Sequence, residues 1–275
     1  METKVTTNYC KLKPSLFVLP VCLVIIIALL LYSQHALSTH RYIEIQKPYF
    51  FFLNATLSQF PNTENNLTQF GDALIFLSLL SVFIIYTPKL WECLISASII
   101  SGVCCCLLKQ LFSIPRPAAM FDNKSFVVVG KTLCGTNSFP SGHSVTIFTV
   151  FTVLLFSFMP QRLTSKIIWI VSLTVLAFML SLTRVAVGAH YPLDVIAGGI
   201  VGYSSGLTGI FISRRYKIWS WINNKKYYPV LMVLLFACFI AITSRTLNEN
   251  LIIFYFSMIG LVVSLFKIVS VYWKR

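Results

Sequence analysis

Charge is scarce in this sequence, and acidic charge is the scarcest. Charged residues make up only 11% of the 275 residues, and just eight residues are Asp or Glu. Hydrophobic residues make up 57%, and the mean hydropathy is +0.80. A water-soluble core of this size cannot bury so much apolar surface. The composition therefore excludes an ordinary soluble domain and predicts a protein that folds in lipid.

The sequence also lacks internal repeats, low-complexity tracts and any linker that would separate a second globular domain. Its apolar runs are continuous rather than alternating, which excludes a transmembrane barrel. We therefore predict an all-α, polytopic transmembrane helix bundle that forms one integral membrane domain over residues 1–275. Within it we expect a six-helix core, at about 70–213, and two additional spans in a C-terminal hairpin at 227–272.

Several apolar runs approach the roughly 20 residues that a helix needs to cross the hydrocarbon layer. The first run is long for a signal peptide and predicts an uncleaved anchor. The predicted spans are residues 16–32, 70–86, 93–108, 144–159, 167–182, 195–213, 230–242 and 251–271. Two longer polar segments, residues 33–69 and 113–143, fall on the opposite side of the membrane from the N-terminus.

The formal net charge of +14 is distributed in a way that indicates membrane orientation rather than nucleic-acid binding. With the N-terminus in the cytoplasm, thirteen basic residues lie on cytoplasmic segments: Lys4, Lys11, Lys13, Lys89, Arg162, Lys166, Arg214, Arg215, Lys217, Lys225, Lys226, Lys274 and Arg275. Outside, apart from the motif residues described below, there are five: Arg41, Lys47, Lys124, Lys131 and Arg245. This asymmetry predicts that both polar segments are extracytoplasmic.

The small residues of the spans predict helix packing rather than disulfides, a metal site or a self-association surface. Of the eight cysteines, only Cys134 lies outside, so no internal disulfide framework is expected. The cysteine run at 104–106 favours packing over metal ligation. Gly198, Gly202 and Gly206 follow at intervals of four, which favours close packing inside the bundle over self-association.

Polar residues that can carry chemistry gather in three clusters beside the outer ends of the spans. In the first, Lys109 continues an apolar helix, where an unpaired charge is costly, and Arg116 lies between two prolines that stiffen its backbone. In the second, Ser141 is a candidate N-cap of an apolar helix, whose backbone amides can bind a phosphate. There Gly142 allows close backbone approach, and His143 can protonate a leaving oxygen.

The third cluster contains Arg184, His190 and Asp194. The histidine and the aspartate are four residues apart, so the carboxylate can hydrogen-bond one imidazole nitrogen, which leaves the other as a nucleophile. Taken singly, each cluster also fits a structural role, such as an interfacial lysine or a capped helix. The topology, however, places all three on one membrane face, where a phosphate group would neutralise the gathered cations.

These residues, in this order, resemble the type 2 phosphatidic acid phosphatase superfamily, whose pattern is K-x6-R-P, then P-S-G-H, then S-R-x5-H-x3-D. The sequence matches at 109–117, 140–143 and 184–194, and it departs at Thr183, where the family usually has serine. The resemblance implies an integral membrane lipid phosphatase that works without a metal or other cofactor.

The resemblance also implies a role for each residue. His190 attacks phosphorus to form a phosphohistidine, Asp194 orients its ring, and His143 protonates the leaving oxygen. The groups that bind the phosphate are Lys109, Arg116, Arg184, Ser141 and the Gly142 amide.

Two alternatives stay open from the sequence. The same phosphohistidine can be passed to a second lipid, which would make the chain a phosphotransferase, and a transporter can recognise phosphate without cleaving it. Candidate substrates are polyprenyl diphosphate, phosphatidylglycerol phosphate, phosphatidic acid and a lipid A-like phosphate. The expected partners are therefore a phosphorylated lipid and the bilayer, and not nucleic acid. Small size and compact loops favour a bacterial inner membrane, with the site facing the periplasm, over an endoplasmic reticulum membrane with a lumenal site.

Overall fold

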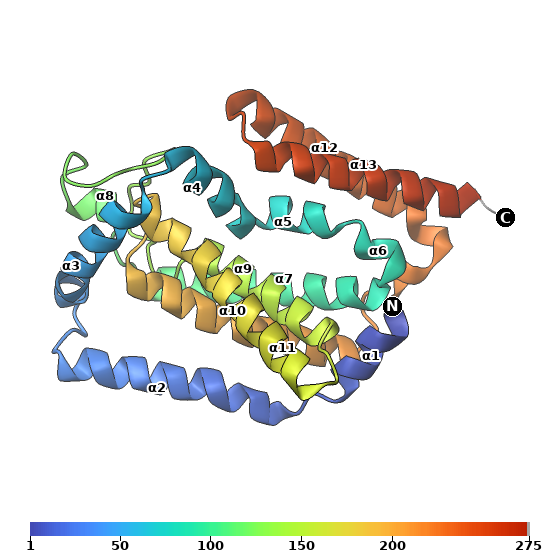
Figure 1. Cartoon of the computed structure of the whole chain (residues 1–275), viewed down its shortest axis with the longest axis horizontal. Coiled ribbons are helices and arrows are strands. Elements are labelled where there is room, and N and C mark those ends of the chain that lie inside the picture. Colours follow the sequence, from blue (N-terminus) through green and yellow to red (C-terminus); the bar gives the residue numbers. More distant parts are fainter. Residues whose placement is uncertain (274–275) are drawn as a thin grey trace.

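The computed structural model describes residues 1–273, and every regular element within them is a helix (Figure 1). The all-α prediction is thus confirmed. The helices are α1 (Glu2–Cys10), α2 (Val18–Ser33), α3 (Thr39–Leu57), α4 (Pro61–Thr68), α5 (Ala73–Leu80), α6 (Phe83–Tyr86), α7 (Pro88–Phe112), α8 (Pro117–Met120), α9 (Gly142–Ser157), α10 (Leu163–Ala186), α11 (Pro192–Arg215), α12 (Tyr228–Asn248) and α13 (Ile252–Trp273). Short 3-10 turns are Pro14–Phe17, Gln69–Gly71, Ser220–Asn223 and Lys225–Tyr227. Lys274 and Arg275, which we assigned to the cytoplasm, lie outside the described residues.

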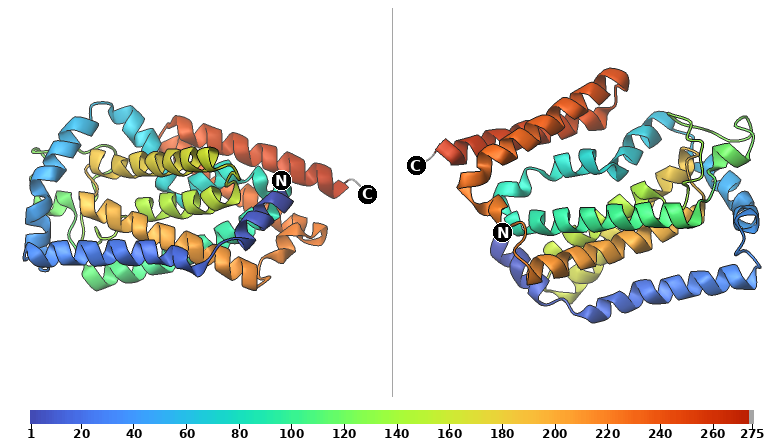
Figure 2. Two further views of the ribbon diagram at one scale, coloured as in Figure 1. Left: turned by 60° about the horizontal axis from the view of Figure 1, so that its bottom comes forward. Right: turned by 180° about the vertical axis from the view of Figure 1, so that it is seen from behind.

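Six segments are long and apolar enough to cross a membrane, which confirms a polytopic protein. They are Pro14–Ser33, Pro88–Met120, Leu163–Ala186, Pro192–Arg215, Lys225–Asn248 and Ile252–Trp273. The shorter apolar helix α9 has 16 residues and packs between these spans, against α7, α10 and α11 (Figure 2).

The predicted span at 70–86 is wrong as a single helix. The chain instead forms α5 and α6, which are separated at Ser81 and Val82. The Ser81 hydroxyl donates to the Ser78 carbonyl at 2.7 Å and lies 2.7 Å from Ser264 Oγ of α13. A helix break within a membrane needs such partners for the backbone groups that it frees. The sequence of one span cannot reveal a partner that lies 183 residues away.

The predicted span at 230–242 is too short. Helix α12 continues to Asn248, and Thr243 and Thr246 donate hydroxyl hydrogen bonds of 2.8 and 2.9 Å to carbonyls one turn earlier. Both hydroxyls therefore have partners within the helix, so they can lie in an otherwise apolar span. Helices α12 and α13 form a hairpin that packs on α5 at one edge of the molecule (Figure 1).

The polar segment at 33–69 forms two helices, α3 and α4. Helix α3 crosses the end of the bundle that is opposite the two chain termini (Figure 1, Figure 2). Buried side chains recur every four residues along it, at Tyr42, Gln46, Phe50 and Asn54. This spacing marks one helix face. Asn54 Nδ2 donates to the Val127 and Ala186 carbonyls, both at 2.9 Å, so this face ties α3 to the loops below it.

Glycines on α11 allow the close approach of its neighbours. A Cβ atom on Gly202 would lie 2.5 Å from the Val145 carbonyl oxygen of α9, and one on Gly209 would lie 2.5 Å from Ala97 Cβ of α7. Gly202 therefore packs within the bundle, as the sequence favoured, and together with Gly209 it makes α11 the central helix of the bundle.

Replacing Gly202 with alanine should destabilise the bundle. The added methyl group has no space between α11 and α9, and such overpacking typically costs about 1–3 kcal/mol. We expect a lower midpoint of thermal unfolding in detergent, followed by intrinsic tryptophan fluorescence. Gly102→Ala on α7 is the matched control, because no atom lies within 4 Å of its Cβ position. Equal losses of stability in the two variants would contradict the packing assignment.

Candidate active site

Three distant segments of the chain meet at the end of the bundle that α3 crosses. The end of α7 and the loop after it supply Lys109 and Arg116, and the N-terminus of α9 supplies residues 141–143. The junction of α10 and α11 supplies residues 184–194. The amide of Ser141 donates to the Asp194 carbonyl at 3.0 Å, and Arg116 Nη1 donates to the Ala189 carbonyl at 3.2 Å. The three sequence clusters therefore form one site.

His190 lies at the centre of this site and is 1% exposed. Its Nε2 atom is 3.3 Å from Arg116 Nη1, and because a guanidinium only donates hydrogen bonds, Nε2 is the acceptor. The ring proton then resides on Nδ1, which faces Asp194 Oδ2 at 3.6 Å. This tautomer leaves the lone pair of His190 on Nε2, on the side of the cations.

The predicted direct hydrogen bond between His190 and Asp194 is replaced by a contact through Ser138. The separation of 3.6 Å is too long for a hydrogen bond. Ser138 Oγ lies 3.4 Å from His190 Nδ1 and donates to Asp194 Oδ2 at 2.6 Å. The same carboxylate oxygen accepts the Tyr191 amide at 3.0 Å, and this cap of α11 holds the carboxylate towards its own helix.

A tyrosine of α3 completes the surroundings of Asp194. Tyr42 Oη donates to Asp194 Oδ1 at 2.7 Å. Together with Ser138 and the Tyr191 amide, it gives three donors to a carboxylate that has no exposed surface. A buried carboxylate is costly without such donors. These bonds therefore fix its position beside His190.

Neutral groups hold all three cations. Arg116 Nε donates to Asn137 Oδ1 at 2.7 Å, and Lys109 Nζ donates to the Asn137 carbonyl at 2.7 Å. Arg184 Nη1 donates to Thr68 Oγ1 at 2.7 Å, whereas its buried Nε has no partner among the described residues. No carboxylate within residues 1–273 forms an ion pair with any of these cations. The site thus carries positive charge that an anion would neutralise.

The second cluster forms the N-terminus of α9, and Ser141 is its N-cap, as predicted. Its Oγ accepts the Ser144 amide at 3.4 Å. A Cβ atom on Gly142 would lie 3.9 Å from Lys109 Cε, so an anion held by this lysine also meets the helix N-terminus. His143 packs directly on Gly71, where any Cβ atom would overlap the imidazole. Gly71 therefore fixes His143 beside the site.

Burial lowers the pKa of the His190 imidazole well below its usual value. The positive charges of Arg116 and Arg184 lower this pKa further. A lowered pKa keeps the ring neutral at neutral pH, so the Nε2 lone pair is available there.

Thr183 stands where the family usually has serine, and its hydroxyl is engaged within α10. It donates to the Leu180 carbonyl at 2.6 Å, and the side chain is buried. The hydroxyl therefore donates its one proton to a helix carbonyl and not to a bound phosphate.

From the sequence, no role was assigned to Tyr42, Thr68, Gly71, Asn137 and Ser138. Ser138 begins the stretch 138–144 that forms the second cluster, and Asn137 directly precedes it, so the position of both was a usable signal. Tyr42 belongs to the buried period-four face of α3, which a search for helical periodicity finds. Thr68 and Gly71 carry no comparable signal, because only the fold brings them to Arg184 and His143.

A cavity of about 360 Å³ opens beside Lys109 and Gly142. It lies between α7 and α9, and its lining continues from Lys109 along α7 to Ser98. Small side chains such as Ser101 and Cys105 form much of its wall. The cavity therefore extends from Lys109 and Gly142 of the site along α7 into the bundle.

Comparison with known proteins identifies the family. Residues 90–217, which include all three clusters, match the PAP2 superfamily. A lipid A 1-phosphatase of Rhizobium etli is 32% identical over 169 residues, which cover 54% of this chain and 69% of that protein. The chain belongs to the PAP2 superfamily. An undecaprenyl-diphosphatase of Sulfolobus acidocaldarius is 29% identical over 138 residues, covering 50% of this PAP2 chain and 62% of that protein. A crystal structure of Aquifex aeolicus LpxE is 27% identical, covers 60% of this chain and 93% of that chain, and has a TM-score of 0.49.

As a PAP2 protein, the chain is an integral membrane lipid phosphatase, and enzymes of this superfamily are metal-independent. Within the part of the chain that the structure describes, no three His, Cys, Asp or Glu side chains gather to form a metal site. The PAP2 match ends at residue 217, so α12 and α13 lie outside it, as expected.

Removing the Tyr42 hydroxyl should impair this PAP2 site while the aromatic ring still fills its space. Tyr42→Phe takes one of three donors from buried Asp194, a loss typically worth about 1–3 kcal/mol. We expect roughly a tenfold or larger fall in kcat, measured as phosphate release in detergent. Tyr49→Phe is the control, because Tyr49 lies on the exposed face of the same helix. Unchanged kcat in Tyr42→Phe would refute a positioning role.

Proposed function

We propose that this chain hydrolyses a phosphomonoester or diphosphate of a membrane lipid through a phosphohistidine on His190. The observation that supports this best is the placement of His190 Nε2, 3.3 Å from Arg116 and among cations without carboxylate partners in the described residues. Such a site suits a group that is both anionic and electrophilic, and a phosphate is both.

The proposed reaction has two steps. In the first, the Nε2 lone pair of His190 attacks phosphorus, the bond from phosphorus to the lipid oxygen breaks, and His143 donates a proton to that oxygen. In the second, water attacks the phosphohistidine, His143 accepts the proton of the water, and the phosphorus–nitrogen bond breaks to release phosphate. Asp194 stabilises the positive charge of the ring through Ser138.

The cations would bind the equatorial oxygens of the phosphate. Lys109, Arg116 and Arg184 approach from three different elements, so they can surround a group whose negative charge is spread over three oxygens. Arg184 has a buried Nε that still needs an acceptor. The Ser141 hydroxyl and the Gly142 amide would add neutral donors at the N-terminus of α9.

The cavity between α7 and α9 supports a lipid as the substrate. From Lys109 to Ser98 its wall follows eleven residues of α7, which is about 16 Å at 1.5 Å per residue. This is close to half of the roughly 30 Å hydrocarbon layer. One lipid chain can therefore lie in the cavity while its phosphate reaches His190. The candidate substrates are polyprenyl diphosphate, phosphatidylglycerol phosphate, phosphatidic acid and a lipid A-like phosphate, and a side-by-side assay of the four distinguishes them.

We further propose that the site faces the extracytoplasmic side of the membrane. In a bacterial inner membrane this side is the periplasm. Segments that carry the basic excess meet at the opposite end of the bundle. There Lys11 donates to Gln161 at 2.8 Å, and Arg214 donates to the Leu12 carbonyl at 3.0 Å. The positive-inside rule assigns that end to the cytoplasm.

The two histidines should give different defects. His190→Ala removes the nucleophile, so it should abolish both turnover and the acid-labile phosphoenzyme in a rapid-quench experiment with labelled substrate. His143→Ala removes only the proton donor, which is typically worth about 10²–10⁴-fold. It should still form phosphoenzyme slowly, and it should be least impaired with a nitrophenyl phosphate, whose leaving group needs little protonation.

Labelled phosphoenzyme in the His190→Ala protein would reject His190 as the nucleophile. Label that moves from the wild-type phosphoenzyme to a second lipid, rather than to water, would identify a phosphotransferase instead.

Single-cysteine labelling should establish the orientation of the site. In a background without native cysteines, Lys131→Cys lies on the loop beside the site, and Lys226→Cys lies at the opposite end. An impermeant maleimide added to intact cells should label only Lys131→Cys, because the basic excess holds Lys226 in the cytoplasm. The reverse pattern would place the site in the cytoplasm.

A further inference from the structure

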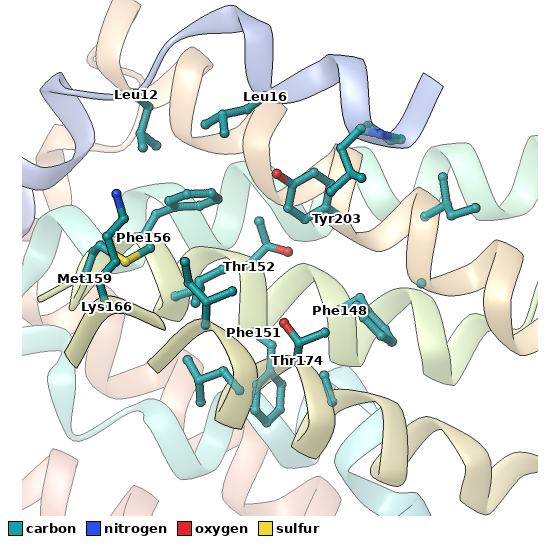
Figure 3. A pocket seen from close by; sticks show the side chains of 18 of the residues that line it. Leu12, Leu16, Phe148, Phe151, Thr152, Phe156, Met159, Lys166, Thr174 and Tyr203 are labelled. Carbon is teal, nitrogen blue, oxygen red and sulfur yellow. The ribbon is translucent and has the colours of Figure 1, made fainter. Parts of the chain in front are cut away.

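A second cavity, of about 760 Å³, lies away from the active site (Figure 3). Its walls come from the segment before α2, from α2 itself, and from α9, α10 and α11. Phe151 and Phe156 of α9 and Tyr203 of α11 line its interior (Figure 3). None of the residues that surround His190 is among its lining residues.

Helix α2 stands apart from the other helices over much of its length (Figure 1), and its residues Leu19, Pro20 and Leu23 line the cavity. In the apolar stretch that contains α2, only 6% of the residues are buried within the chain. In the apolar stretch of α10 the buried share is 11%. Both helices therefore turn apolar side chains towards space that the described protein does not fill. Most of the lining is apolar, so a lipid chain buries apolar surface there that water would leave exposed.

The rim of the cavity is basic at the end that we assign to the cytoplasm. Lys11, Lys13 and Lys166 all line it, and no Asp or Glu does. Lys11 Nζ donates to the neutral Gln161 Oε1 at 2.8 Å, and Gln161 Nε2 in turn donates to Asn8 Oδ1 at 3.0 Å. No ion pair in residues 1–273 involves these lysines. Their charge is therefore available to an anion.

The length of the cavity matches one leaflet of a bilayer. Along α10 its lining runs from Lys166 to Phe178, twelve residues or about 18 Å at 1.5 Å per residue. One leaflet contributes about half of the roughly 30 Å hydrocarbon layer. An extended acyl chain that spans one leaflet therefore matches the length of the cavity.

We propose that this cavity binds an anionic phospholipid of the cytoplasmic leaflet. Its phosphate would lie among Lys11, Lys13 and Lys166, and an acyl chain would lie between α2 and the α9–α11 face. Basic pockets between spans on the cytoplasmic side are suited to anionic headgroups, and an apolar cavity of this size buries a chain well. The bound lipid would join α2 to the bundle.

Native mass spectrometry in detergent tests the proposal with two defined lipids. Wild-type protein is mixed with equal amounts of phosphatidylglycerol and phosphatidylcholine that carry the same acyl chains. We expect retention of one phosphatidylglycerol molecule in preference to phosphatidylcholine, because only the former has net negative charge. Equal retention of the two lipids would overturn the proposal.

Two sets of variants locate the bound lipid. Lys13→Gln with Lys166→Gln should weaken retention of phosphatidylglycerol, roughly fivefold for each lysine. Lys217→Gln with Lys226→Gln removes the same charge from the same end but outside the cavity, and it should have little effect. Thr174→Trp should fill the cavity and reduce retention, whereas Val175→Trp, on the adjacent position outside the lining, should not.

Each control can overturn the assignment. Equal losses in the two lysine pairs would indicate general surface attraction, and normal retention in Thr174→Trp would place the lipid elsewhere. Arg116→Gln tests the remaining anion site, because this substitution alters the active site alone. Loss of the lipid in that variant would assign it to the active site instead.

Discussion

The structure depends on keeping two arginines and one carboxylate out of bulk water without pairing them directly. Neutral side chains make this possible: Asn137 holds Arg116, Thr68 holds Arg184, and Tyr42 and Ser138 hold Asp194. A direct ion pair would neutralise the cations and so weaken their attraction for a substrate phosphate. Neutral partners fix the geometry of the charges and leave most of their electrostatic attraction for the ligand.

Helix packing and chemistry are linked through α11. Its first turn carries Asp194, and one turn later Gly198 allows α9 to approach so closely that a Cβ atom there would lie 2.7 Å from the Ser141 carbonyl. This approach permits the hydrogen bond from the Ser141 amide to the Asp194 carbonyl. A side chain at Gly198 would therefore separate two of the three clusters, since it would displace the N-terminus of α9 from the start of α11.

The sequence predicted the parts that depend on local pattern. Apolar runs predicted most of the spans, apart from the break in 70–86 and the full length of α12. Spacing together with helix-cap chemistry predicted Ser141 and the three clusters. It could not predict features that depend on tertiary contacts. The break at Ser81 relies on α13, and the role of Tyr42 relies on a contact that spans 152 residues. The spacing of His190 and Asp194 predicted a direct hydrogen bond that does not form. The carboxylate instead caps its own helix, and Ser138 lies between it and the imidazole.

The N-terminal helices connect the two ends of the molecule physically. Helix α2 borders the cavity with the basic rim, and five residues after its end the chain enters α3, which carries Tyr42 and Gln46. Gln46 accepts the Leu193 amide at 2.8 Å, so α3 holds both the start of α11 and the carboxylate beside His190. Few contacts of its own hold α2 against the bundle. Helix α3 therefore links the segment that borders this cavity to the carboxylate beside His190, through the hydrogen bond from Tyr42.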